Sequence, residues 1–235
     1  MHDRLDLPDF VAVYDRFRDV PVISISNSQQ APIPWANWQA TIYHGLPREL
    51  FQFYPNRGEY LAFLGRISPE KRADRAIEIA KRVNMPLKIA AKVDRADRRY
   101  FKRVVEPQLN DPHVEWVGEI TDKQKNEFLG EAYALLFPID WPEPFGLVMI
   151  EAMACGTPVI AYDRGSVPEV MENGITGFVV RDLDEAVEAT RRVRDLSRAG
   201  CRDVFEKRFT AGRMADDYVD VYEEMVRQSA TYAYA

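Results

Sequence analysis

The chain has 235 residues, which is long enough for one large domain or two small ones. It is 46% hydrophobic and 29% charged, an ordinary balance for a globular protein with a substantial core. The net charge is −6 without any basic run, so composition argues against nucleic acid or an anionic membrane surface as a partner. The two cysteines are too few for a disulfide scaffold and lack the spacing of a metal site.

The sequence also bears on membrane insertion and location. No apolar run approaches the roughly 20 residues that span a bilayer, so no integral membrane segment is expected. The first residues lack the apolar stretch of a signal peptide, and a cytoplasmic protein is the simplest expectation. Cys155 lies in an apolar stretch and is expected to be an ordinary core residue.

The amino-terminal part predicts a few short elements. Apolar residues from Phe10 to Phe17 recur at helical spacing. Val20–Ser26 predicts a buried strand, and Thr41–Pro47 predicts a short strand that runs into a turn. Residues 27–38 hold two Pro and two Trp and are expected to be irregular.

Beyond residue 59, short apolar runs alternate with helical segments. The predicted strands are residues 60–64, 87–91, 113–117, 133–137, 158–162 and 177–180. This alternation predicts an α/β fold with a Rossmann-like, doubly wound parallel sheet and right-handed crossovers. Ligands bind such a sheet beyond the carboxyl ends of its strands, where the polar motifs of this chain are expected to lie.

Several helices in this region carry start signals or an apolar face. Ser68-Pro69 is expected to begin the helix that follows the first of these strands. Thr121 with Gln124 predicts a capping box. A last helix is predicted over Phe209–Arg227, with inward-facing side chains at Met214, Tyr218, Val221, Tyr222 and Met225.

The most informative stretch is Trp141–Pro158. Residues Pro144–Ala154 predict a short helix that is apolar on all sides and therefore buried. Glu151 lies in its middle and needs a hydrogen-bonding partner, because an unpaired buried charge is too costly. Glu143, eight residues earlier, precedes the helix, where free N–H groups and the helix dipole favour an anion. The alternative is that Glu143 is only a cap and that Glu151 pairs with an internal arginine.

These residues resemble a known family. Glu143 and Glu151 resemble the Glu-x7-Glu signature of family-four retaining glycosyltransferases, which have the two-domain GT-B fold. Upstream, Phe63–Lys71 resembles that family's Gly-Arg…Glu-Lys phosphate-binding element. Downstream, the matching segments of its donor domain are Gly156–Ala161, Gly165–Val170 and Asn173–Phe178. Four elements in the right order make the resemblance specific, and it extends over roughly residues 40–226.

The resemblance implies three catalytic residues. Arg66 and Lys71 would stabilise the negative charge that builds on the departing nucleoside diphosphate, since arginine offers a fork of donors and lysine a compact charge. Glu143 would face the donor sugar. The alternative for Lys71 is a solvated helix start, because Arg72 and Arg75 lie beside it.

The resemblance also implies the donor-binding residues. Glu151 would hold the ribose hydroxyls, and Lys92 to Val93 and Glu119 to Ile120 lie where the family places the nucleobase. Many relatives carry Gly-x-Gly where this chain has Ala91-Lys-Val93, so base recognition departs from the common pattern here. The full expected set is Gly65, Lys92, Val93, Glu119, Ile120, Phe145, Gly146, Leu147, Val148 and Glu151.

No metal and no cofactor are implied beyond the nucleotide-sugar donor, which is expected to be a UDP-sugar. Asp182-Leu-Asp184 matches the Asp-x-Asp metal pattern of a different glycosyltransferase fold. Its position at a predicted helix start, with Glu185 three residues after Asp182, favours helix capping instead.

The implied function is retaining transfer of a hexose from UDP-glucose to an unknown acceptor. Only about 45 residues precede Pro47, too few for an acceptor domain, so the first half of such an enzyme is expected to be a missing domain or a partner chain. The expected parts are residues 1–47 as a remnant of the N-terminal domain and linker, 48–208 as the donor domain, and 209–235 as a crossover helix and tail.

Two other functions remain open from the sequence. One is the nucleotide-sugar-binding half of a split or inactive transferase. The other is a GT-B-type UDP-sugar epimerase, which is disfavoured because the Glu-x7-Glu and Gly-Arg…Lys elements resemble the transferases better.

Overall fold

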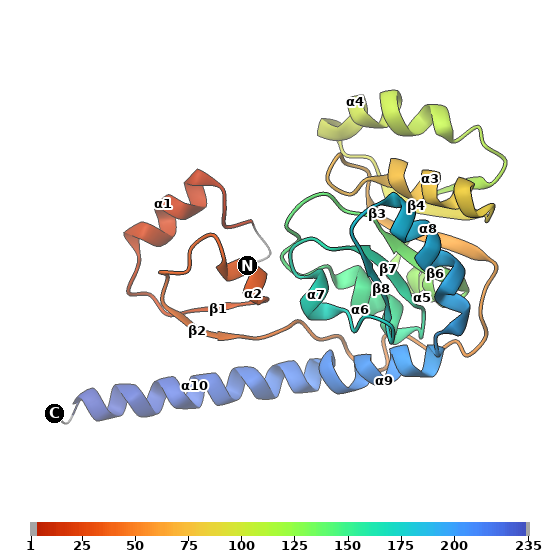
Figure 1. Cartoon of the computed structure of the whole chain (residues 1–235). Helices are drawn as coiled ribbons and strands as arrows, with labels where there is room; N and C mark the ends of the chain where they lie inside the picture. The colour runs from red at the N-terminus through yellow and green to blue at the C-terminus, as the bar shows by residue number, and fades with distance from the viewer. Residues whose placement is uncertain (1–3, 234–235) are drawn as a thin grey trace.

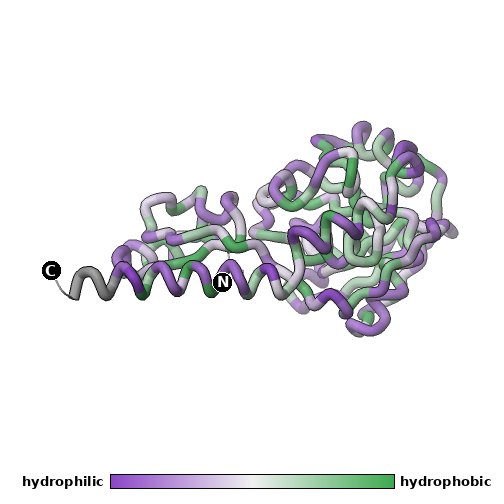
Figure 2. Tube along the Cα trace, turned by 90° about the horizontal axis from the view of Figure 1, so that it is seen from below, coloured by the Kyte–Doolittle hydropathy of each residue, from purple (hydrophilic) through white to green (hydrophobic). Residues whose placement is uncertain are grey.

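The structure, a computed structural model, describes the backbone of residues 4–233 and the side chains of residues 4–228. A small amino-terminal unit and a larger α/β lobe lie side by side, and the long helix α10 (Ala211–Ala233) extends from the lobe past the small unit (Figure 1). Seen from below, the coloured part of α10 alternates between hydrophilic and hydrophobic residues (Figure 2). In the part of the chain that is described, no helix is both long enough and apolar enough to cross a membrane.

The small unit has a core of its own. Its elements are the helices α1 (Pro8–Arg16) and α2 (Asn27–Gln30) and the strands β1 (Val22–Ser24) and β2 (Trp38–Thr41). The two strands pair in parallel. The buried residues that hold the unit together are Leu5, Tyr14, Ile33 and Ala36.

Both strands of the small unit differ from their predicted ranges. β1 is shorter than Val20–Ser26, because Pro21 has no N–H for a ladder and the Ser26 side chain caps α2, 3.0 Å from the Gln29 nitrogen. β2 lies earlier than the predicted Thr41–Pro47, since it ends at Thr41. The reason is that the pairing of β2 with β1 begins at Trp38. The stretch predicted to be irregular also contains α2.

The lobe is built on a six-stranded sheet. Its strands are β3 (Tyr60–Arg66), β4 (Leu87–Lys92), β5 (Val114–Gly118), β6 (Ala132–Phe137), β7 (Val159–Tyr162) and β8 (Gly177–Val180). All neighbours pair in parallel in the order β5-β4-β3-β6-β7-β8, which confirms the predicted Rossmann-like, doubly wound sheet. The strand order reverses between β3 and β6, and ligands bind such sheets at the carboxyl ends beside this switch point.

Helices cover both faces of the sheet. They are α3 (Ala73–Val83), α4 (Arg98–Tyr100), α5 (Asp122–Gly130), α6 (Leu147–Ala154), α7 (Val167–Val170), α8 (Leu183–Arg192) and α9 (Arg198–Arg208). One core lies between the sheet and α5, α6 and α9, and the other lies between the sheet and α3 and α8. β3 supplies both cores, since Ala62 points to the first and Leu61 and Phe63 point to the second.

Two helices begin later than the sequence predicts. α3 begins at Ala73 rather than at Ser68-Pro69, because Arg72 has a left-handed φ of 55° and the chain turns there. α6 begins at Leu147 rather than at Pro144, because Gly146 has a left-handed φ of 80°, which glycine tolerates. Lys71 and Glu143 therefore lie in the loops before these helices, outside their first turns.

The capping predictions and the cysteine prediction are confirmed. Thr121 and Gln124 form a capping box at α5. The Asp182 side chain accepts a hydrogen bond from the Glu185 nitrogen at 2.9 Å, at the start of α8. Cys155 is a fully buried free thiol in the core.

The last helix also differs in detail from its prediction. α10 begins at Ala211, because Phe209 ends α9 with a non-helical backbone (φ −131°, ψ 30°). Tyr222 is 55% exposed, so its predicted inward orientation is wrong. The other residues predicted to point inward are half-buried: Met214, Tyr218, Val221 and Met225.

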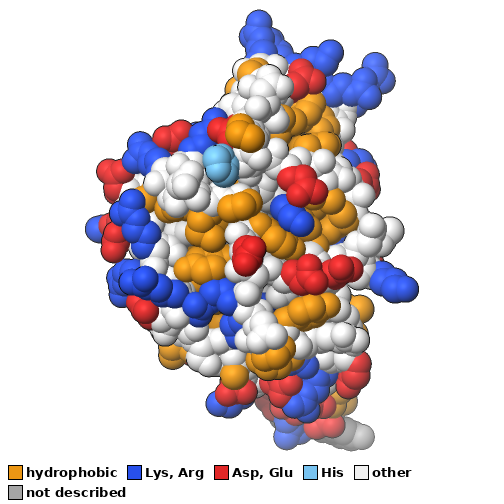
Figure 3. Space-filling view, turned by 90° about the vertical axis from the view of Figure 1, so that its right-hand side faces the viewer, with side chains coloured by type: hydrophobic (Ala, Val, Ile, Leu, Met, Phe, Trp, Pro, Cys, Tyr) orange, Lys and Arg blue, Asp and Glu red, His pale blue; other side chains and the backbone are white. Residues whose placement is uncertain are grey.

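One face of the lobe mixes basic and acidic side chains (Figure 3). On the face drawn in Figure 3, basic and acidic side chains are interspersed around hydrophobic ones. Exposed ion pairs such as Arg181 with Glu185 contribute only about 0–1 kcal/mol each. This face therefore offers no single-sign field that would steer a polyanion.

One buried arginine ties together the loops at the amino ends of the strands. The Arg198 side chain is 5% exposed and donates hydrogen bonds to the carbonyl oxygens of Tyr54, Gly130 and Ala132 at 2.7–2.9 Å. It also donates to Thr157 Oγ1 at 2.7 Å. Burial lowers the pKa of this guanidinium, and none of the ion pairs among residues 4–228 includes it. The Arg198 guanidinium thus links chain segments that are far apart in the sequence through hydrogen bonds to neutral oxygen atoms.

We expect Arg198→Met to lower the free energy of unfolding by about 3–5 kcal/mol, because several buried acceptors lose a charged donor at once. Urea denaturation followed by circular dichroism measures the change. Arg191→Met is the matched control, since the Arg191 side chain is 59% exposed, and its effect should stay within about 0.5 kcal/mol. Equal midpoints for the two variants would contradict the assignment.

Candidate active site

A cavity of about 420 Å³ opens at the carboxyl ends of β3, β4 and β5, beside the start of α6. Its volume lies within the roughly 300–1,000 Å³ that is typical of small-molecule sites. Predicted donor-binding residues form much of its wall: Gly65, Lys92, Glu119, Ile120, Leu147, Val148 and Glu151. The remaining wall residues are Leu64, Ala90, Ala91, Asp122 and Lys125. The sequence therefore predicted a set of residues that the fold brings together.

Glu151 lies in the cavity wall with a lysine as its partner. Its side chain is 13% exposed, and its Oε1 atom lies 3.4 Å from Lys125 Nζ. Lys125 also lies 3.0 Å from Asp122 Oδ1. Burial raises the pKa of the Glu151 carboxyl above its ordinary value, and the attraction of Lys125 only partly offsets this effect. The expected partner exists, and it is a lysine of α5 rather than an internal arginine.

Three predicted donor-binding residues lie outside this wall. The Phe145 ring is 1% exposed and packs in the core, 6.1 Å from the Phe209 ring centroid. Gly146 has a left-handed φ of 80°, a conformation that favours glycine, and a Cβ atom there would lie 2.7 Å from Met149 Cε. Val93 is half-buried against the core on the α3 side of the sheet. A contact of these three with a donor stays a prediction.

Glu143 is the second buried carboxylate, with 8% exposure. Lys71 forms an ion pair with its Oε2 atom, and Trp141 Nε1 donates a hydrogen bond to the same oxygen at 3.0 Å. Lys71 Nζ also lies 4.9 Å from the centroid of the Trp141 ring and 5.4 Å from that of Phe137. Glu143 is thus held by a cation, while the cap position of α6 is taken by Gly146 without a side-chain hydrogen bond.

Arg66 follows Gly65 at the end of β3 and is half exposed. Its guanidinium lies 3.6 Å from Asp97 and 3.8 Å from Asp94. Lys92 lies 3.3 Å from Asp94. These separations exceed the roughly 2.7–2.9 Å of a strong charge-assisted hydrogen bond, so both cations can turn to another anion.

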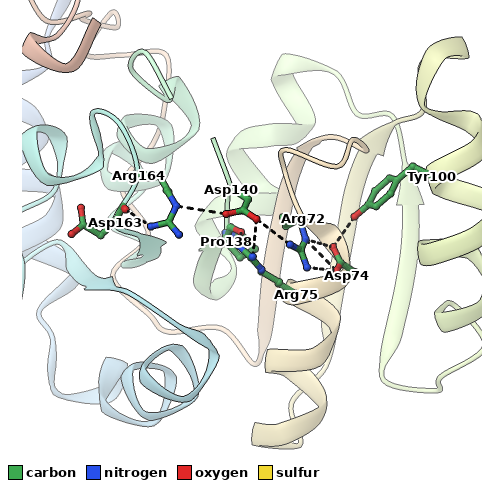
Figure 4. Close-up of polar contacts among 8 residues, drawn as sticks. All are labelled: Arg72, Asp74, Arg75, Tyr100, Pro138, Asp140, Asp163 and Arg164. Carbon is green, nitrogen blue, oxygen red and sulfur yellow. Dashed lines mark hydrogen bonds and ion pairs between the residues drawn. The ribbon is translucent and has the colours of Figure 1, made fainter. Parts of the chain in front are cut away.

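The loop of residues 138–146, which carries Glu143, is anchored by Asp140. Its carboxylate accepts hydrogen bonds from Arg75 at 2.9 Å and Arg72 at 3.2 Å, and it lies 3.6 Å from Arg164 (Figure 4). Burial alone would raise the pKa of Asp140, but the hydrogen bond from Arg75 and the surrounding guanidiniums hold it below its usual value. Helix α3 and the loop after β7 thereby fix one side of the loop.

The other side of the same loop packs against Gly165 and Ser166. The Ser166 nitrogen donates a hydrogen bond to the Glu143 carbonyl oxygen at 2.9 Å. A Cβ atom on Gly165 would lie 2.3 Å from the Glu143 nitrogen, and Gly165 has a left-handed φ of 59°. Glycine is needed at this position because the two backbones touch.

Sequence reasoning missed Lys125, Trp141 and Asp140 as parts of the site. The requirement that Glu151 has a partner was visible, but nothing in the sequence singled out a lysine on the preceding helix. Trp141 and Asp140 lie two and three residues before Glu143, and their roles depend on side-chain directions that a motif does not specify.

A family model described as "Glycosyl transferases group 1" matches residues 51–205. Among curated proteins, α-maltose-1-phosphate synthase of Mycobacterium tuberculosis is 30% identical over 191 residues, which are 73% of this chain and 49% of that protein. The chain spans about half the length of the curated relatives it matches. The similarity therefore concerns only this half, and the activity of the full-length relatives is not assigned to this chain.

Solved structures show the same fold. HepE of Anabaena, in complex with UDP, superposes with a TM-score of 0.83 at 18% identity, over 95% of this chain and 71% of that one. AviGT4, a glycosyltransferase involved in avilamycin A biosynthesis, gives 0.76 at 23% identity, over 87% of this chain and 64% of that one. These likenesses and the parallel sheet identify the GT-B type of Rossmann-like fold. Because residues 51–205 include every motif on which the sequence resemblance depends, the chain belongs to the family of group 1 glycosyl transferases.

Proposed function

We propose that this chain is the donor-binding part of a retaining hexosyltransferase that uses UDP-glucose. In this proposal the cavity takes the nucleoside, and Glu151 accepts hydrogen bonds from the ribose hydroxyls. The observation that carries the proposal is the position of Glu151, a carboxylate with 13% side-chain exposure in the wall of a cavity at the carboxyl ends of parallel strands. Such a group is costly to bury and suits a ligand that brings two hydroxyl donors.

The choice of UDP and glucose follows a solved relative. HepE of Anabaena is described in complex with UDP and with UDP-glucose. The base would lie between the ends of β4 and β5, where Lys92, Glu119 and Ile120 line the cavity. Transfer with retention of configuration is the expectation of the sequence resemblance, and the acceptor is not assigned.

The charges around Glu143 suit departure of a diphosphate. When the bond from the anomeric carbon to the phosphate oxygen breaks, its electron pair stays on the diphosphate, and Arg66 and Lys71 would stabilise that charge. In the structure Lys71 is paired with Glu143. A donor phosphate would therefore compete with Glu143 for this ammonium, and the released carboxylate would face the sugar.

Calorimetric titration with UDP, UDP-glucose, GDP and GDP-mannose tests the donor assignment. We expect the two uridine nucleotides to bind at least about tenfold more tightly than the guanosine ones, a difference of roughly 1.4 kcal/mol. A preference for GDP or GDP-mannose would refute the base assignment. Failure of all four to bind would refute a donor site in this chain.

The site residues are tested by comparing uridine with UDP. We expect Glu151→Ala to weaken both ligands by roughly tenfold or more, because both contain the ribose. Arg66→Ala should weaken UDP by roughly tenfold and leave uridine unchanged, because only UDP carries phosphates. Arg191→Ala on α8 removes an exposed arginine elsewhere and is the control. Equal affinities for parent and variants would contradict the assigned positions.

Lys71 is tested by separating stability from binding. We expect Lys71→Met to lower the free energy of unfolding by about 1–3 kcal/mol, because Glu143 is left buried without its cation. Adding Glu143→Gln should restore part of the loss in thermal unfolding, but UDP affinity should stay reduced. Full recovery of UDP binding in the double variant would show that Lys71 is needed only for Glu143.

A further inference from the structure

Lys125 holds a position between two carboxylates. Among the ion pairs of residues 4–228, it is the cation paired with Glu151, with Nζ 3.4 Å from Oε1. The same ammonium lies 3.0 Å from Asp122 Oδ1. Lys125 comes from α5 and Glu151 from α6, and both side chains line the cavity. Two separate helices therefore meet through this pair at the wall of the candidate nucleoside site.

Among the described residues, no cation other than Lys125 forms an ion pair with Glu151. The other titratable groups on the cavity wall are Lys92, Glu119 and Asp122, and Cys155 at the end of α6 also interacts electrostatically with Glu151. Lys92 forms its ion pair with Asp94, at 3.3 Å, and none with Glu151. Arg198 and Arg202 donate hydrogen bonds to backbone carbonyls around the far end of α6.

We propose that Lys125 is a positioning residue for nucleoside binding, whose ammonium keeps the Glu151 carboxylate charged and directed so that it can accept hydrogen bonds from the ribose. This inference rests on the proposed function and deepens it. Lys125 does not itself need to touch the ligand. It acts on the acceptor strength of Glu151.

The physical reason is the burial of Glu151. Burial raises the pKa of this carboxyl, while the attraction and the hydrogen bond of Lys125 lower it again. A carboxylate offers only acceptors, whereas a protonated carboxyl carries a donor and accepts ribose hydroxyls poorly. Without Lys125 the carboxyl would stay protonated to a higher pH, and nucleoside binding would be lost sooner as the pH falls.

Lys125 itself remains charged where this matters. Burial would lower the pKa of its ammonium, but the attraction of Glu151 and the contacts with Asp122 outweigh burial and raise it. Lys125 therefore stays protonated throughout the range in which Glu151 titrates. The pH dependence then reports on Glu151 alone.

The test is the affinity for UDP-glucose between about pH 5 and pH 8.5, measured by calorimetry for the parent and Lys125→Met. Each phosphate of UDP-glucose carries one ester and one anhydride bond and keeps only its strongly acidic proton, so the diphosphate does not change its charge in this range. We expect Lys125→Met to bind roughly tenfold more weakly near neutral pH and to lose binding at a higher pH than the parent. Lys125→Arg should restore both the affinity and the pH profile.

Lys123→Met is the matched control, because Lys123 lies on the same helix, is exposed and does not line the cavity. It removes the same charge and should keep the parent curve. Circular dichroism checks the fold of each variant, and Lys125→Gln serves if Lys125→Met does not fold. Equal affinity and equal pH dependence for the parent and the Lys125 variant would overturn the inference.

A ligand-free measurement separates this inference from the proposed function. The titration of Glu151 is followed by carbon NMR of its side-chain carboxyl, and its midpoint should move to higher pH in Lys125→Met. An unchanged midpoint overturns the role of Lys125 even if nucleotides bind. If the parent binds no nucleotide, the proposed function and its ribose contact fall, while the titration still decides whether Lys125 controls the charge of Glu151.

Discussion

The site depends on the cost of keeping two carboxylates away from water. Glu143 and Glu151 are eight residues apart, and each is paired with one lysine, Lys71 and Lys125 respectively. An ion transferred into a protein interior costs several kcal/mol unless a partner and hydrogen bonds compensate it. Neither lysine is near its glutamate in the sequence, so only the folded chain can supply this compensation. Burial of these two carboxylates therefore depends on the tertiary contacts that bring each lysine to its glutamate.

The parallel sheet is what brings these partners together. The segments with Lys71, Lys125 and Glu143 follow β3, β5 and β6, and all leave the carboxyl edge of the sheet. The amino edge is organised differently, because Arg198 is surrounded there by neutral carbonyl groups. At the carboxyl edge of the sheet, a charged ligand can compete for a partner in the ion pairs. At the amino edge, the hydrogen bonds of Arg198 are already made to neutral carbonyl groups.

The local alternation of apolar runs and helical segments predicted the sheet, and the resemblance to a known family predicted much of the cavity wall. The wrong predictions come from conformations that such local patterns do not encode. Arg72 and Gly146 turn the chain with positive φ, so both site helices begin later than expected. Lys125 escaped notice because its partner lies on the next helix, at a contact that only packing creates. That Glu151 must have a partner was predictable from burial alone, but the identity of that partner was not.

The two lysine–glutamate pairs differ in what a donor would do to them. In the proposed function Lys71 meets a phosphate, an anion that competes directly with Glu143, so this pair must open when the donor binds. Glu151 meets neutral hydroxyls, which need the carboxylate but have no charge with which to displace Lys125. The second pair can therefore persist in the complex and strengthen the acceptor. Ligand affinity would thus be reduced by competition at Glu143 and supported by an intact ion pair at Glu151.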